Sequence, residues 1–291
     1  MTQIITSLSE VSSRYKALFV DLWGCVHNGI TAFPDAVAAL QAYRAQGGIV
    51  VLVTNSPKPR AGVAAQLGQF NVPEDAYDTI STSGDSARAA MFTGAVGNKV
   101  YFMGEWERDA GFFEPLHVIH NPVEITRVPL KEAEGIVCCG PFDPHADPAV
   151  NRPDFLYAKQ MGMKLLCANP DIVVDRGETR EWCAGALARL YTEMGGESLY
   201  FGKPHPPIYD LARRRLAELG HDIQDAEILA IGDGPHTDIA GAMGEGIDSL
   251  FITGGLAARE TKTSVQPDPE ALEAYLQKEQ SGPTYAIGFL R

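Results

Sequence analysis

Two apolar runs in the first part of the chain each end in polar residues. Residues 17–20 are all apolar and stop at Asp21, and the largely β-branched run over 49–53 stops at the segment Thr54-Asn55-Ser56. Between the two runs, residues 34–46 carry apolar side chains at helical spacing, with a proline near the start and two glycines after the end. This order predicts a βαβ unit, whose right-handed crossover brings the carboxyl ends of both strands to one edge of a parallel sheet.

The pattern then changes in the middle of the chain. A helix over 60–70 and a strand over 78–82 continue the first pattern, whereas the middle has richer loops and helices of its own, such as one over 155–160. The strands predicted for this middle region lie over 99–103, 135–139 and 163–167. We interpret the middle region as a separate inserted domain.

From Ser198 the first pattern returns. The predicted elements are an apolar strand over 199–201 that leads into Gly202-Lys203-Pro204, a helix over 207–219, and a strand over 228–231 that ends in Gly232-Asp233-Gly234. We therefore predict an α/β protein, in which residues 1–84 and 198–291 form a Rossmann-like parallel sheet core. Residues 85–197 form the inserted α/β domain.

Composition and charge narrow the class of partners. The 291 residues include 24 basic and 37 acidic side chains, a net charge of −13 that disfavours nucleic acid and anionic membranes as partners of the whole surface. No signal peptide and no membrane-length apolar run is recognised. The five cysteines are odd in number and lack C-x-x-C spacing, so we expect reduced thiols in a cytoplasmic protein. A zinc site at Cys138 and Cys139 is the less favoured alternative.

Polar residues at four places are expected to meet at one edge of the core sheet: Asp21, Thr54 with Asn55, Lys203, and Asp233 with Asp238. Each has an ordinary structural explanation when taken alone, such as a helix cap, a solvated loop lysine or a tight turn. Together they supply what phosphoryl transfer requires, namely an in-line nucleophile and neutralisation of the charge on the phosphoryl oxygens.

The residue types suggest a role for each side chain. Asp21 can be the nucleophile, and the carboxylates of Asp21 and Asp233 form the sparse oxygen ligand set that Mg²⁺ prefers. Lys203 adds a positive charge that faces the phosphoryl oxygens and offsets the repulsion among the carboxylates. The Thr54 hydroxyl and nearby backbone N–H groups can donate hydrogen bonds to the phosphate.

These segments resemble the four motifs of the haloacid dehalogenase (HAD) superfamily, and in particular its class IIA phosphatases, which carry a large C2-type cap domain between the second and third motifs. The matching segments are Asp21-Leu22-Trp23-Gly24-Cys25-Val26, Val53-Thr54-Asn55-Ser56, Gly202-Lys203-Pro204, and 232–239 with Asp233 and Asp238. The resemblance extends over nearly the whole chain.

The resemblance implies a set of functional residues. Mg²⁺ would be held by Asp21, the backbone carbonyl of Trp23 and Asp233. Asp238 would lie next to these ligands without binding the ion itself. Thr54, Asn55, Ser56 and Lys203 would bind the phosphate. In the middle domain, Ala168-Asn169-Pro170-Asp171 resembles the Thr-Asn-x-Asp element of this cap type, and Asn169 and Asp171 are our candidates for contacts with the leaving group, with a solvated loop as the equal alternative. The family acts on small phosphate esters, including sugar phosphates, nucleotides and pyridoxal phosphate.

Trp23 departs from the family pattern. Phosphatases of this family usually carry a second aspartate at this position, which protonates the leaving alcohol and then activates water. The backbone carbonyl at this position can bind a metal whatever the side chain is. The acid/base group, in contrast, is lost, at a typical cost of about 10²–10⁴-fold in rate for poor leaving groups. His27, in the same loop, is a candidate substitute, and a satisfied loop histidine or a substrate contact is the favoured alternative.

The resulting hypothesis is Mg²⁺-dependent hydrolysis of a small phosphorylated metabolite through an aspartyl-phosphate. Two rivals stay open. One is a HAD hydrolase that acts on a bond other than a phosphate ester, because metal-free haloacid dehalogenases also place an aromatic residue at the Trp23 position. The other is a catalytically weak protein that binds a phosphorylated metabolite. The sequence does not identify the leaving group, and it leaves open whether the protein is a homodimer.

Overall fold

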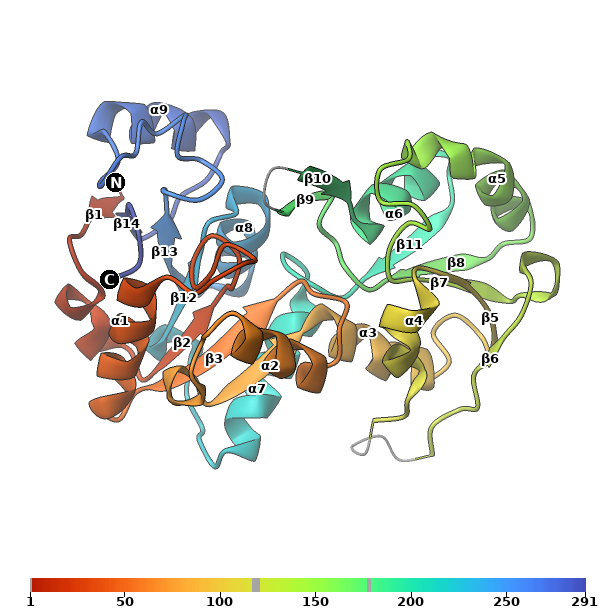
Figure 1. Ribbon diagram of the computed structural model, residues 1–291, viewed down its shortest axis with the longest axis horizontal. Coiled ribbons are helices and arrows are strands. Elements are labelled where there is room, and N and C mark those ends of the chain that lie inside the picture. The colour runs from red at the N-terminus through yellow and green to blue at the C-terminus, as the bar shows by residue number, and fades with distance from the viewer. Residues whose placement is uncertain (1, 117–120, 177–178) are drawn as a thin grey trace. The chain divides into compact units, whose positions relative to one another are not determined.

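The computed structural model describes residues 2–116, 121–176 and 179–291 (Figure 1). Two compact units make up the chain, one containing the residues up to Thr54 together with 63–81 and 203–291, the other containing 55–62 and 82–202. The predicted domain limits after residues 84 and 197 lie near these bounds and stay a prediction. Among the described residues, no helix has both the length and the apolar character needed to cross a membrane.

A seven-stranded sheet forms the centre of the first unit, in the order β1-β14-β13-β12-β2-β3-β4 (Figure 1). Its strands are β1 (Gln3–Ile4), β2 (Ala17–Val20), β3 (Ile49–Thr54), β4 (Thr79–Thr82), β12 (Ile228–Gly232), β13 (Asp248–Ile252) and β14 (Tyr285–Ile287). The pairings from β1 across to β3 are all parallel. The predicted α/β class with a parallel sheet core is confirmed.

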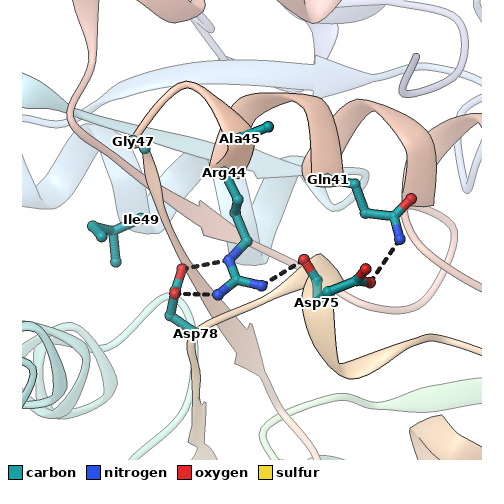
Figure 2. A pocket seen from close by; sticks show the side chains of 8 residues that line it. Gln41, Arg44, Ala45, Gly47, Ile49, Asp75 and Asp78 are labelled. Carbon is teal, nitrogen blue, oxygen red and sulfur yellow. Dashed lines mark hydrogen bonds and ion pairs between the residues drawn. The ribbon is translucent and has the colours of Figure 1, made fainter.

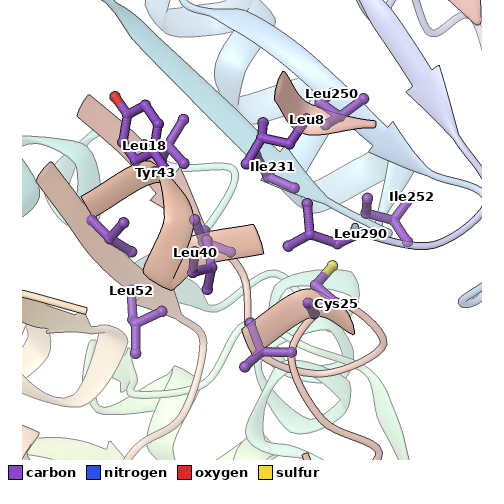
Figure 3. Close-up of a cluster of buried hydrophobic side chains, with 14 of the residues drawn as sticks. Leu8, Leu18, Cys25, Leu40, Tyr43, Leu52, Ile231, Leu250, Ile252 and Leu290 are labelled. Atoms are coloured by element: carbon purple, nitrogen blue, oxygen red, sulfur yellow. The ribbon is translucent and has the colours of Figure 1, made fainter. Parts of the chain in front are cut away.

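Helices cover both faces of this sheet, which explains why its central strands are apolar without alternation. In β2, Leu18 and Val20 pack in one cluster with Leu40 of α1 (Pro34–Ala45), as Figure 3 shows for Leu18 and Leu40. Phe19 packs in a separate cluster with Tyr209 of α7 (Pro206–Glu218). The other helices that lie wholly or partly in this unit are α2 (Arg60–Gln69), a π-helical turn (Pro235–Ile239) that continues into α8 (Ala240–Glu245), and α9 (Pro269–Lys278).

The second unit has its own sheet of five parallel strands, in the order β11-β8-β7-β5-β6. The strands are β5 (Lys99–Met103), β6 (Thr126–Arg127), β7 (Gly135–Cys138), β8 (Lys164–Cys167) and β11 (Glu197–Tyr200), and β9 (Val173–Arg176) and β10 (Thr179–Trp182) form an antiparallel pair. The helices are α3 (Ser83–Phe92), α4 (Trp106–Asp109), α5 (Arg152–Gln160) and α6 (Ala184–Glu193). Buried clusters again lie on both faces of the sheet.

Strand β11 corrects one prediction. The apolar residues 199–201 were expected to begin the returning core, but β11 pairs in parallel with β8, with Leu199 opposite Leu166, and so belongs to the second sheet. The physical reason is that an apolar run fits the covered interior of either sheet, so the run by itself does not select a partner strand. The first unit resumes only at Lys203.

Candidate active site

Adjacent strands of the first unit deliver two carboxylates to one edge of its sheet. Asp21 directly follows β2 and Asp233 directly follows β12, and these two strands pair in parallel with Val20 opposite Ile231. The Asp21 N–H donates to the Ile231 carbonyl at 2.8 Å, which extends the pairing by one residue. Thr54, which is 3% exposed, ends the neighbouring strand β3. The structure therefore brings these three predicted residues to the same edge.

Lys203 and Asp238 join the carboxylates at this edge. The Lys203 ammonium lies 2.6 Å from Asp21 Oδ1 and 2.7 Å from Asp238 Oδ1, with its side chain 4% exposed. The second oxygen of Asp238 accepts a hydrogen bond from the Gly234 N–H at 3.1 Å. A Cβ at Gly232 would lie 2.1 Å from the Asp238 carboxyl carbon, so the absence of a side chain there lets the carboxylate approach the strand end. Asp238 thus fixes Lys203 against the expected nucleophile.

Asp233 is held by the loops on either side of it. Its Oδ2 accepts a hydrogen bond from the Leu256 N–H at 3.0 Å. Gly24 has a φ of +71°, and a Cβ there would lie 2.2 Å from the same oxygen. The loop after β2 therefore approaches the Asp233 carboxylate through a glycine that adopts a left-handed conformation.

The charges at this edge do not balance. Three buried carboxyl groups, Asp21, Asp233 and Asp238, gather around Lys203, and with all three ionised they carry two more negative charges than Lys203 offsets. Burial and the charges of Asp21 and Asp238 raise the pKa of Asp233 well above its ordinary value. Burial, followed by the charge of Asp21, raises the pKa of Asp238 to about 6. Burial alone would lower the pKa of Lys203, yet the Asp21 and Asp238 carboxylates raise it well above its ordinary value.

The donor atoms fit a divalent cation. Ligand atoms of Asp21, Asp233 and Cys25 all lie within 4.8 Å of one another. Within the described residues, the Trp23 carbonyl accepts no hydrogen bond, which leaves it available as a further oxygen donor. Two carboxylates and a carbonyl are hard oxygen ligands of the kind that Mg²⁺ prefers, and a divalent charge would cancel the excess of two negative charges.

Cys25 was not predicted at this position. Its thiol is fully buried, and burial together with the charges of Asp233 and Asp21 raises its pKa well above the ordinary value. The thiol therefore stays protonated and is a poor ligand for a hard cation. In the sequence, the one indication that Cys25 lies near the carboxylates is its place four residues after Asp21 in the same loop.

Trp23 and His27 pack against each other within this loop. Their ring centroids are 5.3 Å apart in an edge-on arrangement, and a Cβ on Gly29 would lie 2.1 Å from the indole. His27 is 2% exposed, its Nδ1 accepts a hydrogen bond from the Gly29 N–H at 3.0 Å, and burial lowers its pKa to about 4. At neutral pH this histidine is a neutral imidazole in the packing of the loop, with almost no surface to offer to a ligand.

The remaining predicted residues lie in the second unit and make hydrogen bonds inside it. Asn55 Nδ2 donates to Asp171 Oδ1 at 2.8 Å, and Asn169 Oδ1 accepts from the Asp171 N–H at 3.0 Å. Ser56 Oγ accepts from the Lys58 N–H at 3.2 Å. The predicted phosphate contacts of Asn55 and Ser56 and the leaving-group contacts of Asn169 and Asp171 stay predictions.

A surface pocket of about 390 Å³ in the first unit is separate from this edge (Figure 2). It lies where β3 and β4 begin, whereas Asp21 and Thr54 lie where strands end. Its polar side chains bind one another: Arg44 Nε donates to Asp78 at 3.0 Å and Gln41 Nε2 to Asp75 at 2.6 Å. The Arg44 guanidinium is therefore paired with Asp78, and the Asp75 carboxylate is bonded to the neutral Gln41 amide.

A buried lysine among carboxylates at the carboxyl edge of a parallel sheet marks an enzyme of the α/β class, and comparison with known proteins identifies the family. The family model described as haloacid dehalogenase-like hydrolase matches residues 18–114, and a second model, HAD-hydrolase-like, matches residues 200–277. A crystal structure of a haloacid dehalogenase-like hydrolase from Brucella suis is 38% identical, covers 99% of this chain and 100% of its own, and superposes with a TM-score of 0.84. The chain belongs to the haloacid dehalogenase-like hydrolase family, as its motifs predict.

Two curated relatives are similar over most of their length. The 5′-nucleotidase YutF of Bacillus subtilis is 25% identical over 265 residues, which is 88% of this chain and 93% of the relative. The acid sugar phosphatase of Staphylococcus saprophyticus is 24% identical over 263 residues, or 87% of this chain and 93% of the relative.

Proposed function

We propose that the chain is a phosphoric monoester hydrolase that uses Mg²⁺ to hydrolyse a small phosphate ester, such as a sugar phosphate or a nucleotide. The observation that carries this proposal is the excess of buried negative charge around Lys203, which matches a site that works with a divalent cation and a phosphate. The two curated relatives, named as a 5′-nucleotidase and an acid sugar phosphatase, support the same chemistry.

In this proposal, Asp21 attacks the phosphorus atom. A new bond forms between a carboxylate oxygen and phosphorus as the bond to the leaving alcohol breaks, and water then hydrolyses the aspartyl-phosphate. Lys203, whose ammonium lies 2.6 Å from Asp21 Oδ1, orients the nucleophile and adds positive charge beside the phosphoryl oxygens. Thr54 donates a hydrogen bond to the phosphate, and Asp238 holds Lys203 in place.

Asp21, the Trp23 carbonyl and Asp233 would hold the cation. When bound, Mg²⁺ supplies positive charge that neutralises the phosphoryl oxygens and orients the ester. Gly24, the residue after Trp23, allows the loop backbone to come close to the Asp233 carboxylate.

Departure of the alcohol is the step for which the loop after β2, all of it described, offers no general acid. The Trp23 indole carries no acidic proton, and His27 is a neutral imidazole packed against it. An alkoxide must therefore leave without help from a general acid, whereas a phenolate leaves readily. We expect aryl phosphates to be hydrolysed much faster than sugar phosphates.

A metabolite panel assayed with Mg²⁺ and with EDTA tests the proposal. Phosphate release from aryl phosphates and from at least one metabolite, abolished by EDTA, is the expected result. Hydrolysis that continues at full rate in EDTA would contradict it, and release of halide from a haloacid without metal would favour the rival hydrolase. Saturable binding of a phosphorylated metabolite without turnover would favour the binding protein.

A further inference from the structure

Asn55 begins the second unit and is hydrogen-bonded to a distant part of that unit. It directly follows Thr54 in the chain and is 4% exposed. Its Nδ2 donates to Asp171 Oδ1 at 2.8 Å, across 116 residues of sequence. A hydrogen bond to a carboxylate is among the stronger ones in proteins, so this contact restrains the residue that comes after Thr54.

The other end of the same amide faces the segment that leads to Lys203. A Cβ on Gly202 would lie 2.5 Å from Asn55 Oδ1 and 2.7 Å from Pro170 Cδ. Gly202 therefore packs its bare Cα directly against Asn55 and Pro170, and Lys203 is the next residue in the chain. Asn55, the residue after Thr54, thus contacts Gly202, the residue before Lys203.

Asp171 lies in a hydrogen-bonded turn. Its N–H donates to Asn169 Oδ1 at 3.0 Å, and its carbonyl accepts from the Gly185 N–H at 3.1 Å. A Cβ on Gly185 would lie 2.0 Å from the Pro170 carbonyl oxygen, so the first turn of α6 packs closely on this segment. The main chain of Asp171, whose carboxylate is the acceptor for Asn55, is therefore held on both sides by hydrogen bonds.

We propose that Asp171 and Asn55 are positioning residues for the phosphate-binding machinery. Their hydrogen bond sets the chain at residues 55 and 202, and through these it sets the neighbouring Thr54 hydroxyl and Lys203 ammonium. The inference rests on the proposed phosphatase function, and it gives these side chains a role other than contact with the leaving group or the phosphate. The Asp171 carboxylate acts through Asn55, whatever alcohol is attached to the phosphate.

Steady-state kinetics on an aryl phosphate and two sugar phosphates test this role. Asp171→Ala should lower kcat/KM by about 10- to 100-fold, the cost of a small misplacement, and by the same factor on every substrate. Asp171→Asn keeps an oxygen acceptor and should retain most of the activity. Asn55→Ala should match Asp171→Ala, and the double variant should be no slower than the slower single variant, because both remove one interaction.

The control is Asp147→Ala. Asp147 lies in the same unit, and its Oδ1 accepts a backbone hydrogen bond from the Ala149 N–H, also at 2.8 Å. The Asp147→Ala variant should have the activity of the wild type. Losses that multiply in the double variant, or a loss in Asp171→Ala that differs among the substrates, would overturn the inference, the latter in favour of a leaving-group contact.

Amide hydrogen exchange gives a readout that does not depend on activity. The amides of residues 54–56 and 202–203 should exchange at least about tenfold faster in Asp171→Ala than in the wild type and in Asp147→Ala. Unchanged exchange at these amides would overturn the positioning role. If the wild type hydrolyses no phosphate ester, the proposed function fails, whereas the exchange rates still decide whether Asp171 restrains this segment.

Discussion

The two units bury charged side chains in opposite ways. In the second unit, the buried Asp85 carboxylate lies 2.8 Å from the guanidinium of Arg88, and Arg88 Nε also donates to the Phe112 carbonyl at 3.1 Å. This pair is balanced within the folded chain. In the first unit, Asp21, Asp233 and Asp238 share Lys203, so negative charge remains in excess.

This difference separates a structural ion pair from a site for chemistry. A buried charge is costly unless it is paired, so a balanced pair is complete without a ligand. Burial and the neighbouring carboxylates raise the pKa of Asp233. A cation bound at this edge would neutralise the clustered negative charge and remove the contribution of the carboxylates. The contrast predicts that substitution of the clustered carboxylates in the first unit changes activity and metal response, whereas substitution at the second unit's pair changes stability.

The largest expected effect is at Asp21. Asp21→Asn replaces the nucleophile by an amide and should lower kcat on an aryl phosphate by about 10⁴-fold or more, as removal of a covalent nucleophile does elsewhere. The control is Asp35→Asn, an exposed aspartate at the start of α1, which should leave the rate unchanged. An Asp21→Asn variant as active as this control would rule out Asp21 as nucleophile.

A second prediction concerns the dependence of the rate on the leaving group. Wild-type rates should fall steeply as the pKa of the leaving alcohol rises, with aryl phosphates about 10²–10⁴-fold faster than sugar phosphates. Trp23→Asp introduces a carboxyl group at the position of the family's acid/base and should flatten this dependence. His27→Ala should leave the slope unchanged, because His27 Nδ1 is already bonded and its pKa is about 4. The reverse pattern, a slope that is shallow in the wild type and steep in His27→Ala, would make His27 the acid.

The balanced pair should respond through stability. Arg88→Met leaves Asp85 buried without its cation and should lower the free energy of unfolding of the second unit by about 3–5 kcal/mol. Urea denaturation measures this loss. The control Arg189→Met removes an exposed arginine whose partner Glu193 lies at 3.6 Å, with both side chains 61% exposed, and should cost less than about 1 kcal/mol. Equal losses in the two variants would remove the contrast between buried pairs and exposed ones.

Local sequence patterns predicted much of the fold and of the sheet edge. Continuous apolar runs that stop at Asp21, Thr54 and Asp233 indicate buried parallel strands, and the crossover rule places their ends together. The helix predicted over 34–46 is found at Pro34–Ala45, and the strand predicted over 99–103 is found at Lys99–Met103. These elements are set by residues that are close in the chain.

What the patterns did not reveal depends on contacts between distant residues. The run at 199–201 carries no local mark of the sheet it joins, and the bond between Asn55 and Asp171 spans 116 residues. The spacing of Asp85 and Arg88 by three residues on α3 was a usable signal for their pair, but their burial follows from the packing of the whole unit. The strands β13 and β14 and helix α9 were not predicted, although the apolar residues 250–252 resemble the runs that were recognised.

The stability of Asp233→Asn with and without Mg²⁺ tests the central claim most directly. In EDTA, the variant should be more stable than the wild type, on the order of 1 kcal/mol, because it removes a carboxylate that is costly to bury and is repelled by Asp21 and Asp238. Mg²⁺ at a hundred times its Kd should stabilise the wild type by about 2.7 kcal/mol and the variant far less, so that the order of stability reverses. Asp268→Asn, which removes an exposed charge while an asparagine still caps α9, should respond to Mg²⁺ as the wild type does. An Asp233→Asn variant that is less stable than the wild type in EDTA and gains as much from Mg²⁺ would contradict the account.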